Sequence, residues 1–373
     1  MYFKDIIGQE EIKKRLIKSA QMKIVPHAQL FSGGAGAGTF ALALAYAQYL
    51  NCTNRSETDS CGECPSCKMF DQLAHPDLHF VFPIIKKEKK KTVCDDYLKE
   101  WREFLFQSRY PDYQNWLKEI DAGNSQLLIY SEESEEIIRK MSLRIYEAEY
   151  RILLVWLPEK MHATCANSLL KTIEEPPERT VILMISESPE MILGTIYSRA
   201  QQIKIPFITN DKISEALIKE FGLTQDDAAR VAHLSQGDWN KATEIISVSD
   251  ENKEFLDYFK SFMRLSWKRD VKALKDMADK LAGLGRERQK SFLAYCQQLI
   301  RENFVYRFQS PDLNYMNIEE TRFAVNFAPY VNERNVVEMM DELATAENDI
   351  AQNVNSKMVF FDLFLHISVL IRR

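Results

Sequence analysis

The sequence lacks an apolar segment long enough to cross a bilayer as a helix, which takes about 20 residues. The longest apolar stretch, Met358–Ile371, is shorter than that and contains Asp362 and His366. The first residues, Met1–Asp5, also lack the apolar core of a secretory signal peptide. We therefore expect a cytoplasmic protein with no membrane partner.

An excess of positive charge is absent as well. The net charge is −6 at pH 7, from 48 basic and 54 acidic side chains. A protein that coats nucleic acid needs a basic surface, so this balance excludes a general coat protein and leaves room for a local basic patch. Internal repeats and low-complexity segments are also missing. The 373 residues, 46% of them hydrophobic, suffice for two or three domains with cores of their own.

Four of the seven cysteines are crowded into one segment, at Cys52, Cys61, Cys64 and Cys67. The spacing C-x8-C-x2-C-x2-C lets short turns bring four thiolates onto one ion in a closed tetrahedral shell, which is typical of a structural site. Zinc is favoured over an iron–sulfur cluster, because nothing else in the sequence suggests redox chemistry. Disulfides and free thiols are the alternatives, although closely spaced sets of this kind in cytosolic chains are usually metal sites.

A glycine-rich segment, residues 32–40, follows a short apolar run and precedes a predicted helix. Gly33 and Gly38 occupy the two glycine positions of the phosphate-binding motif G-x-x-x-x-G-K-[ST], but Thr39 stands at the lysine and Phe40 at the hydroxyl. The lysine would place a positive charge on the β and γ phosphates, and the hydroxyl would hold Mg²⁺. We therefore predict a degenerate phosphate loop with absent or weak ATP binding. A glycine turn that never bound nucleotide is the alternative.

Apolar runs that alternate with helical segments predict a parallel sheet covered by helices, an α/β fold. Strands are expected at 29–31, 78–82, 151–157 and 181–185, and a helix is expected at 163–175. Residues 84–126 break this alternation and predict a partly exposed insertion with some helix. Within it, the basic run at 86–91 is typical of a solvated loop.

After Pro206 the pattern predicts helices alone. Two apolar stripes predict burial in a helical bundle or against a partner: Phe255, Tyr258, Phe259 and Phe262, then Val359, Phe360, Leu363, Phe364, Ile367 and Leu370. The predicted domains are 1–205, which contains the cysteine module 52–67 and the insertion, then a small helical domain at 206–250 and an all-helical domain at 251–373.

Several segments together resemble the clamp-loader AAA+ family of bacterial DNA polymerase III. They are GQE at 8–10, PHAQLFSG at 26–33, the cysteine cluster after the loop helix, ANSLLKTIEEPP at 166–177 and SRA at 198–200. The resemblance implies a RecA-like AAA+ domain, a helical lid and a helical collar domain that holds a ring together. It also implies gamma/tau and delta subunits, the β sliding clamp and primer–template DNA as partners.

Within this family, the chain resembles the delta-prime branch rather than the gamma/tau motor. The motor carries an Asp-Glu pair about ten or eleven positions before the asparagine matched by Asn167, and this chain has Trp156 and Leu157 there. The motor also has a lid arginine three residues after a glycine, where Asn240 follows Gly237. Together with the altered loop, three nucleotide-handling features are missing.

One catalytic element of the family is kept. Ser198-Arg199 matches the Ser-Arg-Cys motif, with Ala200 in place of the cysteine. The resemblance implies that Arg199 reaches into the ATP site of a neighbouring subunit, a role that suits a planar, permanently charged guanidinium. The alternative is a surface arginine that ends a helix.

We therefore expect a ring subunit that is not an ATPase on its own and that supplies Arg199 to a neighbouring gamma/tau ATPase during clamp loading. An autonomous AAA+ ATPase acting on DNA is one rival, and a zinc-dependent nucleic-acid-binding module is another. ATP turnover by the isolated chain would favour the first rival, and salt-sensitive DNA affinity would favour the second.

Overall fold

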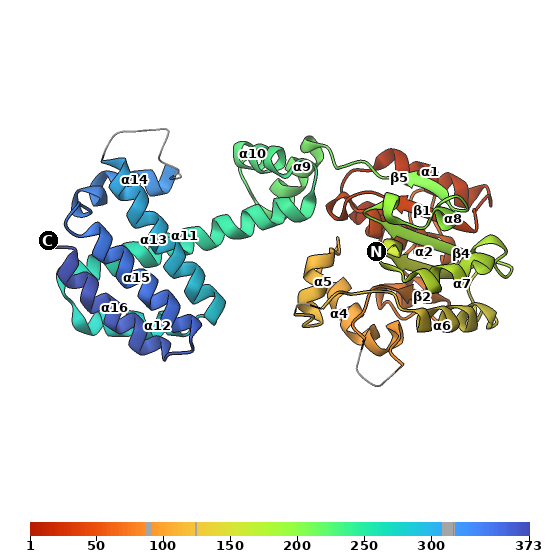
Figure 1. Ribbon diagram of the computed structural model, residues 1–373. Helices are drawn as coiled ribbons and strands as arrows, with labels where there is room; N and C mark the ends of the chain where they lie inside the picture. Colours follow the sequence, from red (N-terminus) through yellow and green to blue (C-terminus); the bar gives the residue numbers. More distant parts are fainter. Residues whose placement is uncertain (87–90, 124, 308–315, 317) are drawn as a thin grey trace. The chain divides into compact units, whose positions relative to one another are not determined.

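A computed structural model of the chain describes residues 1–86, 91–123, 125–307, 316 and 318–373 (Figure 1). Most of the predicted basic run, residues 87–90, lies outside the described residues. The chain forms two compact units, Met1–Ile245 and Ile246–Arg373. The predicted domain borders at 205/206 and 250/251 stay predictions.

The first unit is built on a five-stranded sheet with the order β2-β3-β4-β1-β5. All of its pairs are parallel, as the alternating pattern predicted. The strands are β1 Ala28–Ser32, β2 Leu78–Val81, β3 Arg151–Trp156, β4 Thr180–Ser186 and β5 Gln201–Lys204. Every residue of β3 and β4 is buried, because central strands of a parallel sheet are covered on both faces. The carboxyl ends of β1, β3 and β4 therefore meet at one edge, where the glycine loop begins.

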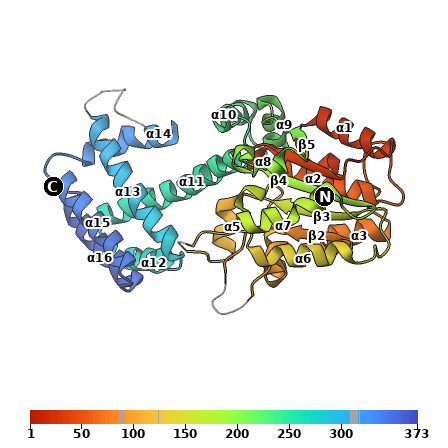
Figure 2. The same cartoon turned by 45° about the vertical axis from the view of Figure 1, so that its right-hand side comes forward.

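The first unit also contains helices, and some of them cover this sheet (Figures 1 and 2). They are α1 Glu10–Gln21, α2 Thr39–Asn51, α3 Pro65–Asp71, α4 Leu98–Gln107, α5 Tyr113–Glu119, α6 Ser131–Ser142, α7 Ala163–Glu174, α8 Gly194–Tyr197, α9 Asn210–Phe221 and α10 Gln225–Ser235. All 13 residues of α2 are buried, and this helix packs on β1, β3, β4 and α1. A helix that is apolar all round needs such a position, so α2 holds the glycine loop firmly at its N-terminus.

The insertion between β2 and β3 is packed on the sheet by its aromatic side chains. Trp101 stacks on Phe82 with ring centroids 4.2 Å apart, and it lies 5.1 Å from both Trp116 and Trp156. The indole of Trp116 donates a hydrogen bond of 2.7 Å to the carbonyl of Pro83. Phe106 is exposed, so the predicted exposure holds for part of the insertion, while its tryptophans are fully buried.

The second unit consists of helices, as predicted. They are the C-terminal part of α11 Trp239–Lys268, then α12 Val271–Ala282, α13 Arg286–Tyr306, α14 Ile318–Phe327, α15 Val336–Ala351 and α16 Ser356–Leu370. The two predicted apolar stripes meet in one core, where the rings of Phe262 and Phe364 lie 4.3 Å apart. Their burial in a bundle is therefore confirmed.

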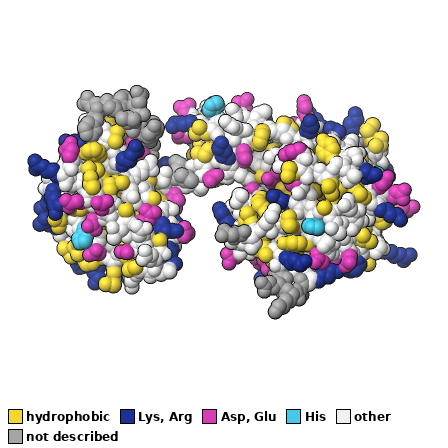
Figure 3. All heavy atoms as spheres, viewed as in Figure 1, with side chains coloured by type: hydrophobic (Ala, Val, Ile, Leu, Met, Phe, Trp, Pro, Cys, Tyr) yellow, Lys and Arg dark blue, Asp and Glu magenta, His cyan; other side chains and the backbone are white. Residues whose placement is uncertain are grey.

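Among the described residues, no helix has the length and apolarity needed to cross a membrane. On the face shown in Figure 3, basic and acidic side chains are interspersed.

Candidate functional site

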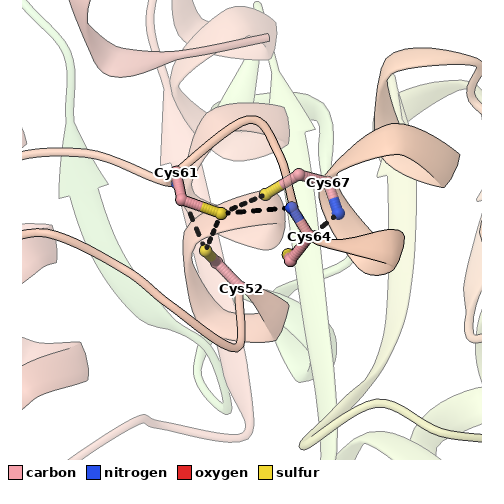
Figure 4. A group of neighbouring side chains, drawn as sticks. All are labelled: Cys52, Cys61, Cys64 and Cys67. Atoms are coloured by element: carbon pink, nitrogen blue, oxygen red, sulfur yellow. Dashed lines mark hydrogen bonds between the residues drawn. The ribbon is translucent and has the colours of Figure 1, made fainter.

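The four clustered cysteines converge on one point, although they come from different elements (Figure 4). Cys52 follows the last residue of α2, Cys61 lies in a loop, Cys64 caps α3, and Cys67 lies in the first turn of α3. Their sulfur atoms all lie within 4.8 Å of one another. The Sγ atom of Cys61 is 3.5 Å from that of Cys52 and 4.0 Å from that of Cys67.

These distances fit a tetrahedral metal site. Four sulfurs at a Zn–S distance of about 2.3 Å lie roughly 3.8 Å apart. Backbone N–H groups also support the sulfurs: those of Cys61, Cys64 and Cys67 donate to the preceding cysteine's Sγ at 3.3, 3.4 and 3.4 Å. Such donors stabilise thiolates, the form that binds a metal. The cluster is thus compatible with a structural zinc ion held by all four side chains.

The cysteine module also anchors the start of the chain. The carboxylate of Asp59 accepts hydrogen bonds from the backbone N–H groups of Phe3 and Lys4, at 3.1 and 3.0 Å. The hydroxyl of Tyr2 donates to Asp71 at the end of α3. The module therefore positions the N-terminal residues.

The glycine loop has the shape of a phosphate loop without its charges. Gly38 adopts the left-handed conformation (φ +84°), which favours glycine, at the start of α2. Thr39 is buried, and its hydroxyl donates to the carbonyl of Gly34 at 3.2 Å. The hydroxyl is thus used to hold the loop itself.

Three side chains from elsewhere lie directly on the glycines of this loop. A Cβ atom added to Gly36 would lie 1.8 Å from the Asp238 carboxylate, and one on Gly38 would lie 2.8 Å from the Tyr110 ring. A Cβ atom on Gly34 would lie 2.8 Å from the ring of Phe207. Side chains larger than glycine at these positions would clash with the residues that cover the loop. The carboxylate of Asp238 lies at the part of the loop that, in a phosphate loop, attracts an anion.

The end of β3 lacks the carboxylates of an ATPase. Trp156 is buried in the aromatic cluster described above, and Leu157 has a positive φ of 56°. The nearest acid, Glu159, accepts hydrogen bonds from the backbone N–H groups of Glu187 and Ser188, at 2.9 and 3.1 Å. Its carboxylate therefore holds the turn after β4.

Glu187 lies in an environment that disfavours its charge. Burial raises the pKa of Glu187 to about 7, and the carboxylates of Glu159, Asp112 and Asp238 add to this increase, while Lys160 opposes it. The acids around the loop thus repel one another. The same field would repel the phosphates of a nucleotide.

This environment predicts a pH dependence of stability. The raised pKa means that the folded chain binds the Glu187 proton more tightly than the unfolded chain does. The resulting stabilisation is complete below the ordinary glutamate pKa and is lost as the pH rises through about 7. We expect Glu187→Gln to be more stable than the wild type above pH 7, by on the order of 3 kcal/mol, and to approach it near pH 4.5.

Chemical denaturation across this pH range measures the effect. Glu190→Gln, at an exposed position of the same segment, is the matched control and should show no such trend. A Glu187→Gln difference that is the same at every pH would contradict the assignment.

Arg199 lies between the short helix α8, which ends at Tyr197, and β5. Its Nε atom is 3.2 Å from Oε2 of Glu174, the last residue of α7, and its Nη1 donates to the carbonyl of Thr195 at 2.9 Å. The Arg199 side chain keeps 35% of its surface exposed. Ser198 is exposed, and its hydroxyl donates to the same carbonyl at 3.3 Å. The guanidinium is thus oriented and still accessible.

Comparison with known families shows to which family the chain belongs. Residues 8–209 match the family model described as DNA polymerase III, delta subunit. The chain belongs to this family. Membership confirms the resemblance to clamp-loader AAA+ subunits of DNA polymerase III, and the parallel sheet described above agrees with it.

The relatives of the chain include proteins named as delta' subunits and as tau/gamma subunits. The chain is 27% identical to DNA polymerase III subunit delta' of Bacillus subtilis over 67% of its own length and 61% of that protein. It is 26% identical to subunit tau/gamma of Haemophilus influenzae, over 58% of this chain and 25% of that protein. The chain therefore spans between about a quarter and three fifths of these relatives. A solved gamma-subunit-related protein of Thermotoga maritima aligns with 98% of the chain and 100% of its own, with 13% identity and a TM-score of 0.38.

The site residues predicted from the sequence thus fall into three groups. The structure brings the four cysteines together, keeps Gly33, Gly38 and Thr39 in one loop, and leaves Ser198 and Arg199 at a separate exposed position. Sequence reasoning missed Tyr110, Phe207 and Asp238, which cover the loop. Their contacts join positions far apart in the chain, so no local spacing pointed to them.

Proposed function

We propose that this chain is a non-motor, delta-prime-type subunit of the bacterial replicative clamp loader. It holds a hetero-oligomeric ring with gamma/tau and delta subunits and supplies Arg199 to the ATP site of the neighbouring gamma/tau subunit. The ring loads the β sliding clamp onto primed DNA. The zinc ion of the four cysteines is structural in this proposal and takes no part in the chemistry.

The observation that carries the proposal is the state of the glycine loop. It has no lysine, no acidic residues at the end of β3 and no lid arginine, and it is covered by Tyr110, Phe207 and Asp238. Phosphoryl transfer is catalysed almost entirely by positioned charge, so such a loop has no means to hydrolyse ATP.

The position of Arg199 supports the second part of the proposal, its action on the ATP site of a neighbouring subunit. Nε and Nη1 are held by Glu174 and the carbonyl of Thr195, while part of the guanidinium surface stays accessible. A guanidinium has five N–H donors in a fixed plane, so it can keep these bonds and still donate to phosphate oxygens of another subunit. Glu174 acts as a positioning residue in this arrangement.

The isolated chain should neither bind nor hydrolyse ATP. At millimolar Mg-ATP, we expect no saturable binding by calorimetry and no phosphate release above the buffer rate. Thr39→Lys should not restore binding, because the loop stays covered and Thr39 itself is only 1% exposed. Tight, magnesium-dependent binding with repeated turnover by the wild type would instead establish an autonomous AAA+ ATPase. Salt-sensitive DNA affinity of the chain alone would favour the nucleic-acid-binding module.

A further inference from the structure

We infer that Arg109 and Tyr110, which lie in the insertion between α4 and α5, form a permanent tie between the glycine loop and the lid. The lid here means α9, α10, which packs on α9, and the first turn of α11; Arg109 contacts α9 and Tyr110 contacts α11. The tie occupies the place beside the glycine loop where a nucleotide would lie. The inference rests on the proposed function in one respect, namely that no nucleotide enters the loop. Its consequence is a lid whose position does not respond to ATP.

Tyr110 makes three connections at once. Its ring lies on Gly38, at the N-terminus of α2. Its hydroxyl accepts a hydrogen bond of 2.9 Å from the backbone N–H of Ile7, and its carbonyl accepts one of 3.0 Å from the side-chain amide of Asn240. The residue is 1% exposed. One buried side chain and its carbonyl thus join the N-terminal segment, the glycine loop and the first turn of α11.

Arg109 extends this tie to α9. Its Nη1 donates to the carbonyl of Asp5 at 2.7 Å, and its Nη2 lies 2.8 Å from the carboxylate of Glu220. Glu220 is the second-last residue of α9, so the ion pair connects the insertion with the end of a lid helix. Arg109 also lies over the ring of Tyr110, with its guanidinium carbon 5.9 Å from the ring centre.

The tie is rigid because the helix that precedes it, α4, is held by buried aromatic packing. Tyr110 follows α4, whose residues Trp101 and Phe104 are locked in the buried aromatic cluster against Trp156. Asn240 stands three residues after Gly237, and its amide is used to hold Tyr110. The insertion therefore connects the end of β3, the glycine loop and the lid in a single chain of contacts.

Hydrogen–deuterium exchange of the full-length chain tests the tie. In Tyr110→Ala, we expect amide exchange in α9 and α10 to become roughly tenfold faster, which corresponds to about 1.4 kcal/mol, while α15 and α16 of the second unit exchange as in the wild type. Tyr110→Phe, which loses the bond to Ile7 but keeps the ring on Gly38, should show a smaller increase. Adding Mg-ATP should not slow the exchange of the Tyr110→Ala lid.

A second variant covers the case in which Tyr110→Ala does not fold. Arg109→Ala removes the contacts with Asp5 and Glu220 at a partly exposed site, and it should speed exchange in α9 several-fold. Unchanged exchange of α9 and α10 in a folded Tyr110→Ala or in Arg109→Ala would overturn the inference. That result would leave the proposed function intact as long as the wild type binds no ATP, whereas ATP binding by the wild type would contradict the proposed function itself.

Discussion

Replacing Cys61 by serine should abolish zinc binding and unfold residues 52–71 together with the N-terminal turn. Cys61 is central to the cluster, since its sulfur lies 3.5 and 4.0 Å from those of Cys52 and Cys67. Structural zinc sites contribute roughly 10 kcal/mol or more of binding free energy to local folding, and three ligands recover only part of it. Because Asp59 anchors Phe3 and Lys4, the loss should also reach the start of the chain.

Zinc content per chain, measured by atomic absorption, gives the first readout, and hydrogen exchange of residues 1–7 and 52–71 gives the second. Cys94→Ser is the matched control: it removes one buried cysteine outside the cluster and should leave one zinc per chain. The metal assignment would be wrong if the wild type, purified in reducing buffer with added zinc, carried none.

Arg199→Ala should slow the DNA-stimulated ATPase of the assembled ring without changing its assembly. An arginine supplied in trans is worth about 10³–10⁵ in rate, so the single ATP site that Arg199 serves should become nearly silent. The ATPase rate of the whole ring should therefore fall by at least the fraction of the total rate that this one site contributes. Reconstitution with the gamma/tau and delta subunits, followed by size-exclusion chromatography and phosphate release, measures both properties.

Two further substitutions separate charge from orientation. Arg199→Lys keeps the charge but loses the planar fork, so it should resemble the alanine variant more than the wild type. Glu174→Gln weakens the ion pair at 3.2 Å and should reduce the rate by at most about fivefold, because exposed pairs are worth roughly 0.2–1 kcal/mol. If a ring with Arg199→Ala hydrolyses ATP at the wild-type rate, Arg199 does not act in the ATP site of the neighbouring subunit.

The sequence predicted those features that depend on neighbouring residues. The runs that form β3 and β4 are apolar because both faces of these strands are covered, and that pattern is visible without a structure. The cysteine spacing likewise predicted the cluster, since short gaps leave few ways to arrange four thiols. The helix expected at 163–175 was found at Ala163–Glu174, where the prolines that follow end it.

The closure of the glycine loop could not be predicted in this way. Tyr110 and Gly38 are brought together only by the folded insertion, and Asp238 reaches Gly36 only once the lid helices are in place. Partial exposure was predicted for the insertion because residues 84–126 break the alternation of strands and helices, and that pattern gave no packing partner for its aromatic side chains. Trp156, which the resemblance set opposite an acid of the motor subunits, is one packing partner of Trp101.

The burial of Trp156 restricts which side chains position 156 can hold. An aspartate at this position would be enclosed by the rings of Trp101 and Phe104 and would cost on the order of several kcal/mol of folding stability. A lysine at position 39 would face a similar penalty beneath its cover. A single substitution that introduces a charge at position 39 or 156 is therefore expected to lower the stability of the fold.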